Sequence, residues 1–154
     1  MIEREQLKNL LAFYRLKQKK IVFTNGCFDL LHLGHITYLE KAKALGNILM
    51  VGLNSDNSVK KLKGIARPIL DQNARSQILA ALQIVDNVII FEEDTPYSLI
   101  QQIEPDILVK GGDYQLNTIV GADFVLAKGG KVEIIPIVEG YSTTVLIEKS
   151  NIKS

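Results

Sequence analysis

Five short apolar segments, each separated from the next by a helix-like stretch, most constrain the fold of this chain. The segments are almost continuously apolar, which is typical of strands buried on both faces of a parallel sheet. They span residues 21–23, 48–53, 88–91, 107–109 and 132–137. Such strands in alternation with helices predict an α/β fold, with helices on both faces of the sheet.

The helix-like stretches support this prediction. In residues 3–16, Leu7, Leu10, Leu11 and Tyr14 recur at the spacing of one helix face. Asp71 can cap a helix that follows it. Further helices are expected at 34–46, from Thr95-Pro96 to just before Pro105, through 124–125 and from 142 onward. We therefore expect a Rossmann-like, doubly wound parallel sheet of five strands.

Length and composition indicate one globular domain. The chain has 154 residues, of which 47% are hydrophobic and 23% charged, and its formal net charge is +1. This balance argues against a nucleic-acid or anionic-membrane partner. No apolar run approaches the roughly 18 residues that a membrane span needs. We expect a cytoplasmic protein with a single domain over 1–154, made of a helical extension (1–19) and a catalytic core (20–149).

Polar and glycine-rich turns follow four of the five predicted strands. They span residues 24–35, 54–56, 111–114 and 140–144. Ligands of open parallel sheets bind beyond the carboxyl ends of the strands, where these turns would meet. The sequence therefore predicts the functional site at this edge.

The turn after the first strand, TNGCFDLLHLGH, carries the most specific signal. It holds His32 and His35, the two histidines of the chain, at the expected start of a helix. A helix N-terminus favours anions, and Gly34 between the histidines permits close approach of a ligand. This combination favours binding of phosphate groups.

The segment resembles the His-x-Gly-His motif of the cytidylyltransferase-like nucleotidyltransferases. The segments KGGDY (110–114) and EGYSTT (139–144) resemble the second and third nucleotide-site segments of that superfamily. More narrowly, NSD (54–56), LKG (62–64), RP (67–68) and EEDTP (92–96) resemble heptose 1-phosphate adenylyltransferases. Those enzymes often form the second half of a protein whose first half is a sugar kinase. This chain resembles the stand-alone form.

The resemblance implies transfer of AMP from ATP to D-glycero-D-manno-heptose 1-phosphate, which gives ADP-heptose and pyrophosphate for the lipopolysaccharide core. The attacking group would be an oxygen of the sugar phosphate. This phosphate monoester is already largely dianionic at neutral pH, because its second pKa is about 6. Such a reaction needs no general base. It depends on positioning and on electrostatic stabilisation of the phosphates.

The resemblance also implies roles for individual residues. His32, His35 and Lys63 are the expected catalytic residues, and Arg75 is a further cation. The β- and γ-phosphates are expected at Ser142, Thr143 and Thr144. Asp29 and Asp56 are candidates for the sugar phosphate. The remaining residues expected at the substrates are Thr24, Asn25, Gly26, Cys27, Phe28, Gly34, Lys110, Gly111, Gly112 and Asp113. Mg²⁺ is expected to be held mainly by the phosphates of ATP, with no protein ligand, and a homodimer is usual among relatives.

Several alternatives remain open at the level of sequence. Cys27, His32 and His35 could ligate zinc, although their spacing is not a standard zinc pattern. Cys27 could be a nucleophile, and the glycine and Ser-Thr turns could be ordinary connections and caps. Within the superfamily, a glycerol-3-phosphate cytidylyltransferase is the alternative, but 137–139 lacks the arginine of those enzymes and Tyr141 replaces a small aliphatic residue. An inactive, nucleotide-binding regulatory protein is the alternative of another class.

Overall fold

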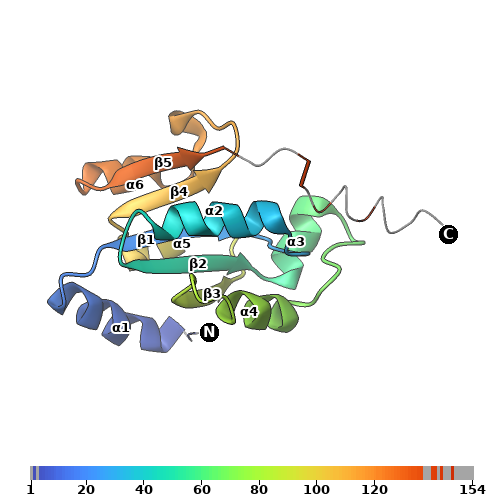
Figure 1. Ribbon diagram of the computed structural model, residues 1–154, viewed down its shortest axis with the longest axis horizontal. Helices are drawn as coiled ribbons and strands as arrows, with labels where there is room; N and C mark the ends of the chain where they lie inside the picture. Colours follow the sequence, from blue (N-terminus) through green and yellow to red (C-terminus); the bar gives the residue numbers. More distant parts are fainter. Residues whose placement is uncertain (1, 3, 137–139, 142, 144–146, 148–154) are drawn as a thin grey trace.

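The chain folds into one parallel sheet between two layers of helices (Figure 1). The computed structural model describes residues 2, 4–136, 140, 141, 143 and 147. The five strands have the order β3-β2-β1-β4-β5, and every pairing is parallel. They are β1 (Ile21–Gly26), β2 (Ile48–Asn54), β3 (Asn87–Phe91), β4 (Ile107–Gly111) and β5 (Lys131–Ile135). The predicted Rossmann-like class is confirmed.

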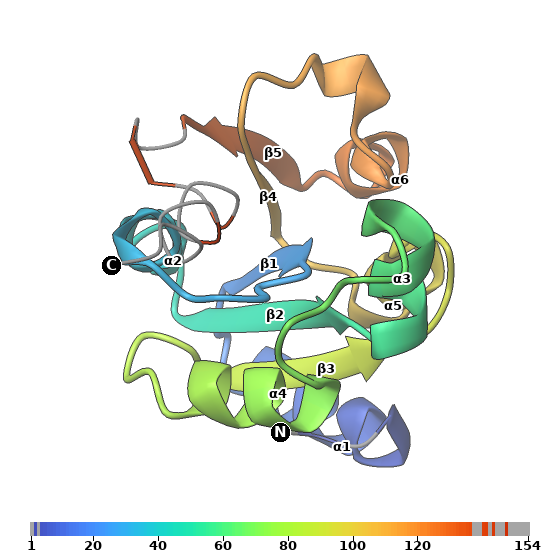
Figure 2. The same ribbon diagram turned by 90° about the vertical axis from the view of Figure 1, so that its right-hand side faces the viewer.

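Helices cover both faces of the sheet (Figure 2). On one face, α1 (Arg4–Leu16), α5 (Tyr97–Ile103) and α6 (Ala122–Ala127) pack against side chains such as Phe23 and Met50. On the other face, α2 (Leu33–Lys43) and α4 (Gln72–Ala80) pack against Val22 and Val51. Successive residues of each central strand point to opposite faces, so the continuous apolar strands supply both cores.

The N-terminal helix is part of the main core. Leu7 is fully buried and Leu11 is 4% exposed, and both belong to the same apolar cluster as Phe23 of β1. Helix α1, which lies within the expected extension 1–19, therefore contributes buried surface to the domain.

The sheet opens between β1 and β4 at its carboxyl edge. β1 pairs with β2 over its whole length, but it pairs with β4 only at Val22–Ile107 and Phe23–Leu108. The strand order also reverses here, because the chain moves outward from β1 through β2 to β3 and then returns to β4. Such a switch point creates a crevice in which ligands of doubly wound sheets bind.

One helix was not predicted from the sequence, and one lies outside the described residues. The unpredicted helix is α3 (Asp56–Lys63), whose N-cap Ser55 accepts a hydrogen bond from the backbone N–H of Ser58. The helix expected from 142 onward falls mostly on residues that the structure does not describe. No helix in the described part of the chain is long and apolar enough to cross a membrane.

Candidate active site

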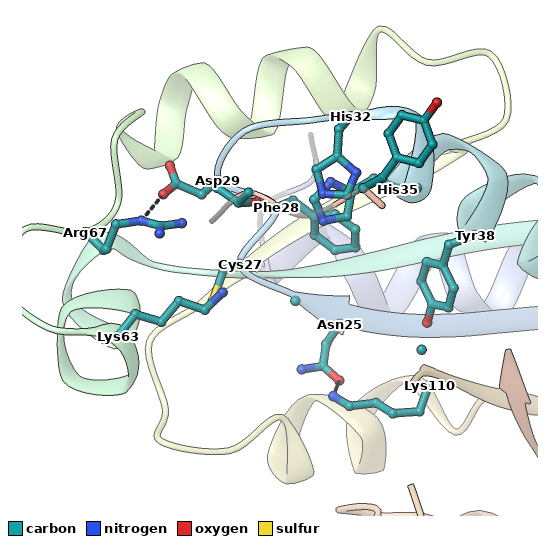
Figure 3. Close-up of a pocket in the computed structure, with 15 residues that line it drawn as sticks. Asn25, Cys27, Phe28, Asp29, His32, His35, Tyr38, Lys63, Arg67 and Lys110 are labelled. Carbon is teal, nitrogen blue, oxygen red and sulfur yellow. Dashed lines mark hydrogen bonds and ion pairs between the residues drawn. The ribbon is translucent and has the colours of Figure 1, made fainter. Parts of the chain in front are cut away.

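A cavity of about 630 Å³ lies at the carboxyl edge of the sheet, where β1 and β4 separate (Figure 3). Its size is within the range of about 300–1,000 Å³ that small-molecule sites occupy. It joins the loop after β1 to the end of α3, the end of β4 and the segment around Thr143. The lining residues are Asn25, Gly26, Cys27, Phe28, Asp29, His32, Gly34, His35, Tyr38, Lys63, Arg67, Lys110, Gly111, Tyr141 and Thr143.

The two histidines form one surface of this cavity. His32 is the N-cap residue of α2, and the backbone N–H of His35 donates to its carbonyl oxygen at 2.9 Å. Their rings are stacked with centroids 3.9 Å apart and an interplanar angle of 27°. Phe28 packs against the ring of His35 at a centroid distance of 5.3 Å. The helix start thus places both imidazoles side by side.

Both histidines favour their neutral form. Burial, together with the smaller effects of the nearby His32 and Lys63, lowers the pKa of His35 to about 4. Burial also lowers the pKa of His32. At neutral pH the pair therefore offers uncharged imidazoles, each of which can donate one hydrogen bond. Such donors can follow a developing negative charge without the cost of burying two adjacent cations.

Gly34 leaves room for this stacking. A Cβ at this position would lie 3.0 Å from Cε1 and Nδ1 of His32 and 3.2 Å from Cβ of Tyr141. These distances are shorter than ordinary van der Waals contact. The glycine of the His-x-Gly-His motif therefore leaves the space that the first histidine ring occupies.

Three cations from three different elements line the cavity. Lys63 is the last residue of α3, Arg67 lies in the loop between α3 and α4, and Lys110 lies in β4. Burial lowers the pKa of Lys110, whose Nζ donates to Oδ1 of Asn25 at 3.2 Å. The only carboxylate among the described lining residues is Asp29. This excess of positive charge suits a polyphosphate.

Asp29 is already fully engaged by the protein. Its Oδ2 accepts from Nε of Arg67 at 2.6 Å, and its Oδ1 accepts from the backbone N–H groups of Ile69 at 2.8 Å and Leu70 at 3.1 Å. Its side chain is 1% exposed. The sequence suggested direct contact with the sugar phosphate, whereas the structure shows a carboxylate that fixes the segment 67–70.

The structure corrects the expected places of Arg75 and Asp56. Arg75 does not line the cavity: its side chain is fully buried, and it donates to the carbonyl oxygens of Cys27, Asn54 and Leu70. Its Nη2 also forms an ion pair with Oδ1 of Asp56 at 2.7 Å. Because α4 brings this arginine beneath the loop after β1, it ties three elements together below the cavity.

Other predicted residues lie near the cavity without lining it. Thr24 is buried, and its hydroxyl hydrogen-bonds to that of Tyr38 at 2.5 Å. Gly112 is buried and donates to the carbonyl of Ile135, and Asp113 is exposed. Ser142 and Thr144 lie outside the described residues.

Three lining residues were missed by the sequence-based assignment: Tyr38, Arg67 and Tyr141. Tyr38 lies one helical turn after His35 on α2, so its spacing was a usable signal. Burial raises its pKa to about 12, which keeps its hydroxyl protonated. In the sequence, Arg67 forms part of a family-like Arg-Pro pair and Tyr141 departs from related enzymes, and neither pattern by itself indicates a place at the cavity.

The metal and nucleophile alternatives find no support. Within the described ranges, no group of three or more His, Cys, Asp or Glu side chains is placed to hold a metal ion. Burial raises the pKa of the Cys27 thiol, despite the nearby cations Lys63 and Arg75. The thiol is therefore protonated at neutral pH and a weak nucleophile.

Comparisons with known proteins agree with this geometry. A family model described as cytidylyltransferase-like matches residues 23–149. The chain is 54% identical over 146 residues to the "Bifunctional protein HldE" of Syntrophotalea carbinolica, covering 95% of this chain and 30% of that protein. It is 58% identical over 142 residues to the protein of the same name from Campylobacter jejuni subsp. doylei, covering 92% and 30%. The chain thus spans less than a third of the length of these relatives.

One solved structure is also similar to this chain. It is the crystal structure of "the lipopolysaccharide core biosynthesis protein" from Thermoplasma volcanium, with 31% identity and a TM-score of 0.64. The match covers 80% of this chain and 99% of that one.

Proposed function

The chain belongs to the cytidylyltransferase-like family of nucleotidyltransferases, and from this premise we propose that it transfers AMP from ATP to D-glycero-D-manno-heptose 1-phosphate. The products are ADP-heptose and pyrophosphate. The choice of substrate is supported by the resemblance to heptose 1-phosphate adenylyltransferases, by the HldE relatives and by the similar lipopolysaccharide core biosynthesis protein. The product accordingly supplies the lipopolysaccharide core.

One observation carries the proposal: two stacked, neutral imidazoles face a cavity that holds three cations and no unpaired carboxylate among its described residues. This is a surface for a polyphosphate, and its described residues do not include a paired base and nucleophile of the kind that a hydrolase uses. The reaction that suits such a surface is displacement at phosphorus by a group that is already an anion.

The proposed step balances without proton transfer. An oxygen of the sugar phosphate forms a bond to the α-phosphorus of ATP, and the bond from that phosphorus to the bridging oxygen of pyrophosphate breaks. His32 and His35 donate hydrogen bonds to the triphosphate, which strengthen as charge develops. Lys63 lies between the attacking and attacked phosphates and lowers their repulsion. Positioning and electrostatics supply the catalysis.

Magnesium fits this proposal as part of the nucleotide. Both oxygens of Asp29, the lining carboxylate, are engaged by Arg67, Ile69 and Leu70. The described residues that line the cavity therefore offer no free carboxylate to Mg²⁺, which prefers phosphate oxygens and water in such sites. We propose that the ion enters on ATP and neutralises charge on its phosphates.

Two further proposals follow from the family and the substrates. Because homodimers are usual among these enzymes, we propose a homodimer, which light scattering of the purified chain would measure. Because ATP and sugar phosphates are cytoplasmic metabolites, we propose that the reaction takes place in the cytoplasm.

The experiment that tests the function is pyrophosphate release with each of the four nucleoside triphosphates and a panel of sugar and polyol phosphates. We expect release with ATP and heptose 1-phosphate, and little with CTP. Release with CTP and glycerol 3-phosphate would favour the cytidylyltransferase alternative. Tight ATP binding without turnover on any acceptor would favour a regulatory protein.

A further inference from the structure

Arg67 is held at the cavity by a buried carboxylate. Its Nε donates to Oδ2 of Asp29 at 2.6 Å, and its side chain is only 15% exposed. Oδ1 of the same carboxylate accepts from the backbone N–H groups of Ile69 and Leu70. Three contacts thus fix the segment that carries the arginine, and the guanidinium lies at the cavity wall in a defined orientation.

Nε is the guanidinium nitrogen of Arg67 that has a hydrogen-bond partner in the described part of the chain. Nη2 of Arg67 is buried and makes no hydrogen bond to any described residue. A buried donor without an acceptor costs free energy, and more when it carries charge, so native structures rarely leave one unexplained. Because the guanidinium lines a cavity that is rich in positive charge, a phosphate oxygen of a ligand is the natural acceptor for its unpaired N–H groups.

The position of Arg67 indicates which phosphate this would be. In Figure 3, Arg67 and Lys63 lie on one side of Cys27, and the two histidines lie on the other. In-line displacement puts the attacking and leaving oxygens on opposite sides of the α-phosphorus. If the histidines hold the triphosphate, the attacking phosphate approaches from the side of Lys63 and Arg67.

We propose that Arg67 recognises the phosphate group of the acceptor through its guanidinium group, and that Asp29 is a positioning residue that acts through Arg67. This inference rests on the proposed function and assigns the acceptor side of the same cavity. Lys63 serves both phosphates, whereas Arg67 serves the acceptor alone. Asp29 therefore contributes to recognition without touching the substrate.

The test compares Michaelis constants for the two substrates in Arg67→Gln, Arg67→Lys and Asp29→Asn, with pyrophosphate release as the assay. Losing a hydrogen bond to a charged group corresponds to roughly a 10–100-fold change. We expect Arg67→Gln to raise KM for the sugar phosphate by about this factor, with KM for ATP within about twofold of wild type. Arg67→Lys keeps the charge and should recover part of the loss. Lys61→Gln is the matched control, because Lys61 is a solvent-exposed cation of α3 that pairs with Asp94.

The role of Asp29 is tested by a double-mutant cycle. The Asn side chain can still accept from the N–H groups of Ile69 and Leu70 but presents no charge to Arg67. Asp29→Asn should raise KM for the acceptor in the wild-type background and change it less than twofold in the Arg67→Gln background. A further tenfold rise in that background would mean that Asp29 contacts the acceptor itself, and the positioning role would be wrong.

The outcomes separate this inference from the proposed function. Wild-type turnover with heptose 1-phosphate, combined with equal changes of both KM values in Arg67→Gln, would overturn the role of Arg67 and leave the function standing. Turnover only with another phosphate ester would overturn the proposed substrate. The change in KM for that ester, compared with the change in KM for ATP in Arg67→Gln, would then decide the role of Arg67. Absence of turnover with every ester would remove both. Thermal unfolding of each variant shows which variants are folded. If Arg67→Gln does not fold, Asp29→Asn provides the same comparison of KM for the acceptor with KM for ATP.

Discussion

His32 and His35 lie with their ring centroids 3.9 Å apart, so a proton on one ring disfavours a proton on the other. Burial acts in the same direction and keeps the pKa of His35 near 4. The site therefore separates two tasks that a charged histidine would combine. Hydrogen bonding falls to the imidazoles, and charge neutralisation falls to Lys63, Arg67 and Lys110.

We expect replacement of either histidine by alanine to lower kcat by roughly 10²–10³, because each removes one hydrogen-bond donor to the transition state. Folding should be retained, since neither ring belongs to the two main apolar clusters. Steady-state pyrophosphate release measures the effect, and circular dichroism checks the fold. Near-normal turnover of both variants would remove the phosphate-stabilising role.

The lowered pKa of His35 also predicts how stability depends on pH. The unfolded chain binds a proton at this residue near pH 6.5, whereas the folded chain binds it only near pH 4. The contribution of His35 to the free energy of unfolding is therefore present above pH 6.5 and is lost as the pH falls towards 4. Urea unfolding of wild type and His35→Asn across this window measures it.

The wild-type protein should lose more stability than His35→Asn between pH 6.5 and 4. Because the chain holds two histidines, their imidazole NMR signals are readily assigned with the same variant. Titration of the His35 signal near pH 6.5 in the folded protein would contradict the burial argument.

At the scale of elements, the strands were predictable because a strand that is buried on both faces is apolar at almost every position in the sequence. β2 is buried at every residue from Ile48 to Asn54. Helix α3 was not predictable in the same way, because Ser58 and Val59 are its only buried residues and lysines dominate its last turn. Its local sequence holds two apolar residues, Val59 and Leu62, so its formation depends on the cap at Ser55 and on packing.

The carboxyl-edge location of the site followed from topology, but the partners of individual charges did not. Arg75 was expected at the phosphates because the resemblance to the nucleotidyltransferases implied a further cation at this position. Its actual partners, the Cys27 and Asn54 carbonyls and Asp56, come from segments 48, 21 and 19 residues away in the chain. Such contacts depend on how α4 packs against the sheet, which the sequence alone does not specify.

Arg75 should accordingly contribute to stability. We expect Arg75→Met to lower the free energy of unfolding by about 3 kcal/mol, because it leaves buried carbonyl groups without donors and breaks the pair with Asp56. Chemical denaturation measures this change. Arg15→Met is the control, since Arg15 is half exposed and should change stability by less than about 1 kcal/mol. Equal, small effects would show that the buried network is not a structural tie.

At the scale of the whole molecule, the first helix and the crevice have separate roles. Helix α1 completes the core on the face away from α2 and α4, whereas the separation of β1 from β4 opens the functional edge. The site residues come from segments spread between Asn25 and Thr143, so the sheet must form before the cavity exists. Function therefore depends on the integrity of the complete domain.

Leu7→Ala tests the contribution of α1. Leu7 is fully buried, so its truncation should lower the free energy of unfolding by roughly 2–5 kcal/mol. Leu16→Ala, at a position 79% exposed on the same helix, should change it by less than about 0.5 kcal/mol. A negligible effect of Leu7→Ala would mean that residues 1–19 form a dispensable extension.

The central claim is that the stacked imidazoles of His32 and His35 bind the triphosphate of ATP. A crystal structure with Mg²⁺ and a non-hydrolysable ATP analogue tests it most directly. We predict ring nitrogens of both residues within hydrogen-bonding distance of phosphate oxygens, about 2.7–3.2 Å. A triphosphate bound elsewhere on the sheet edge, with neither imidazole in contact with it, would contradict the account.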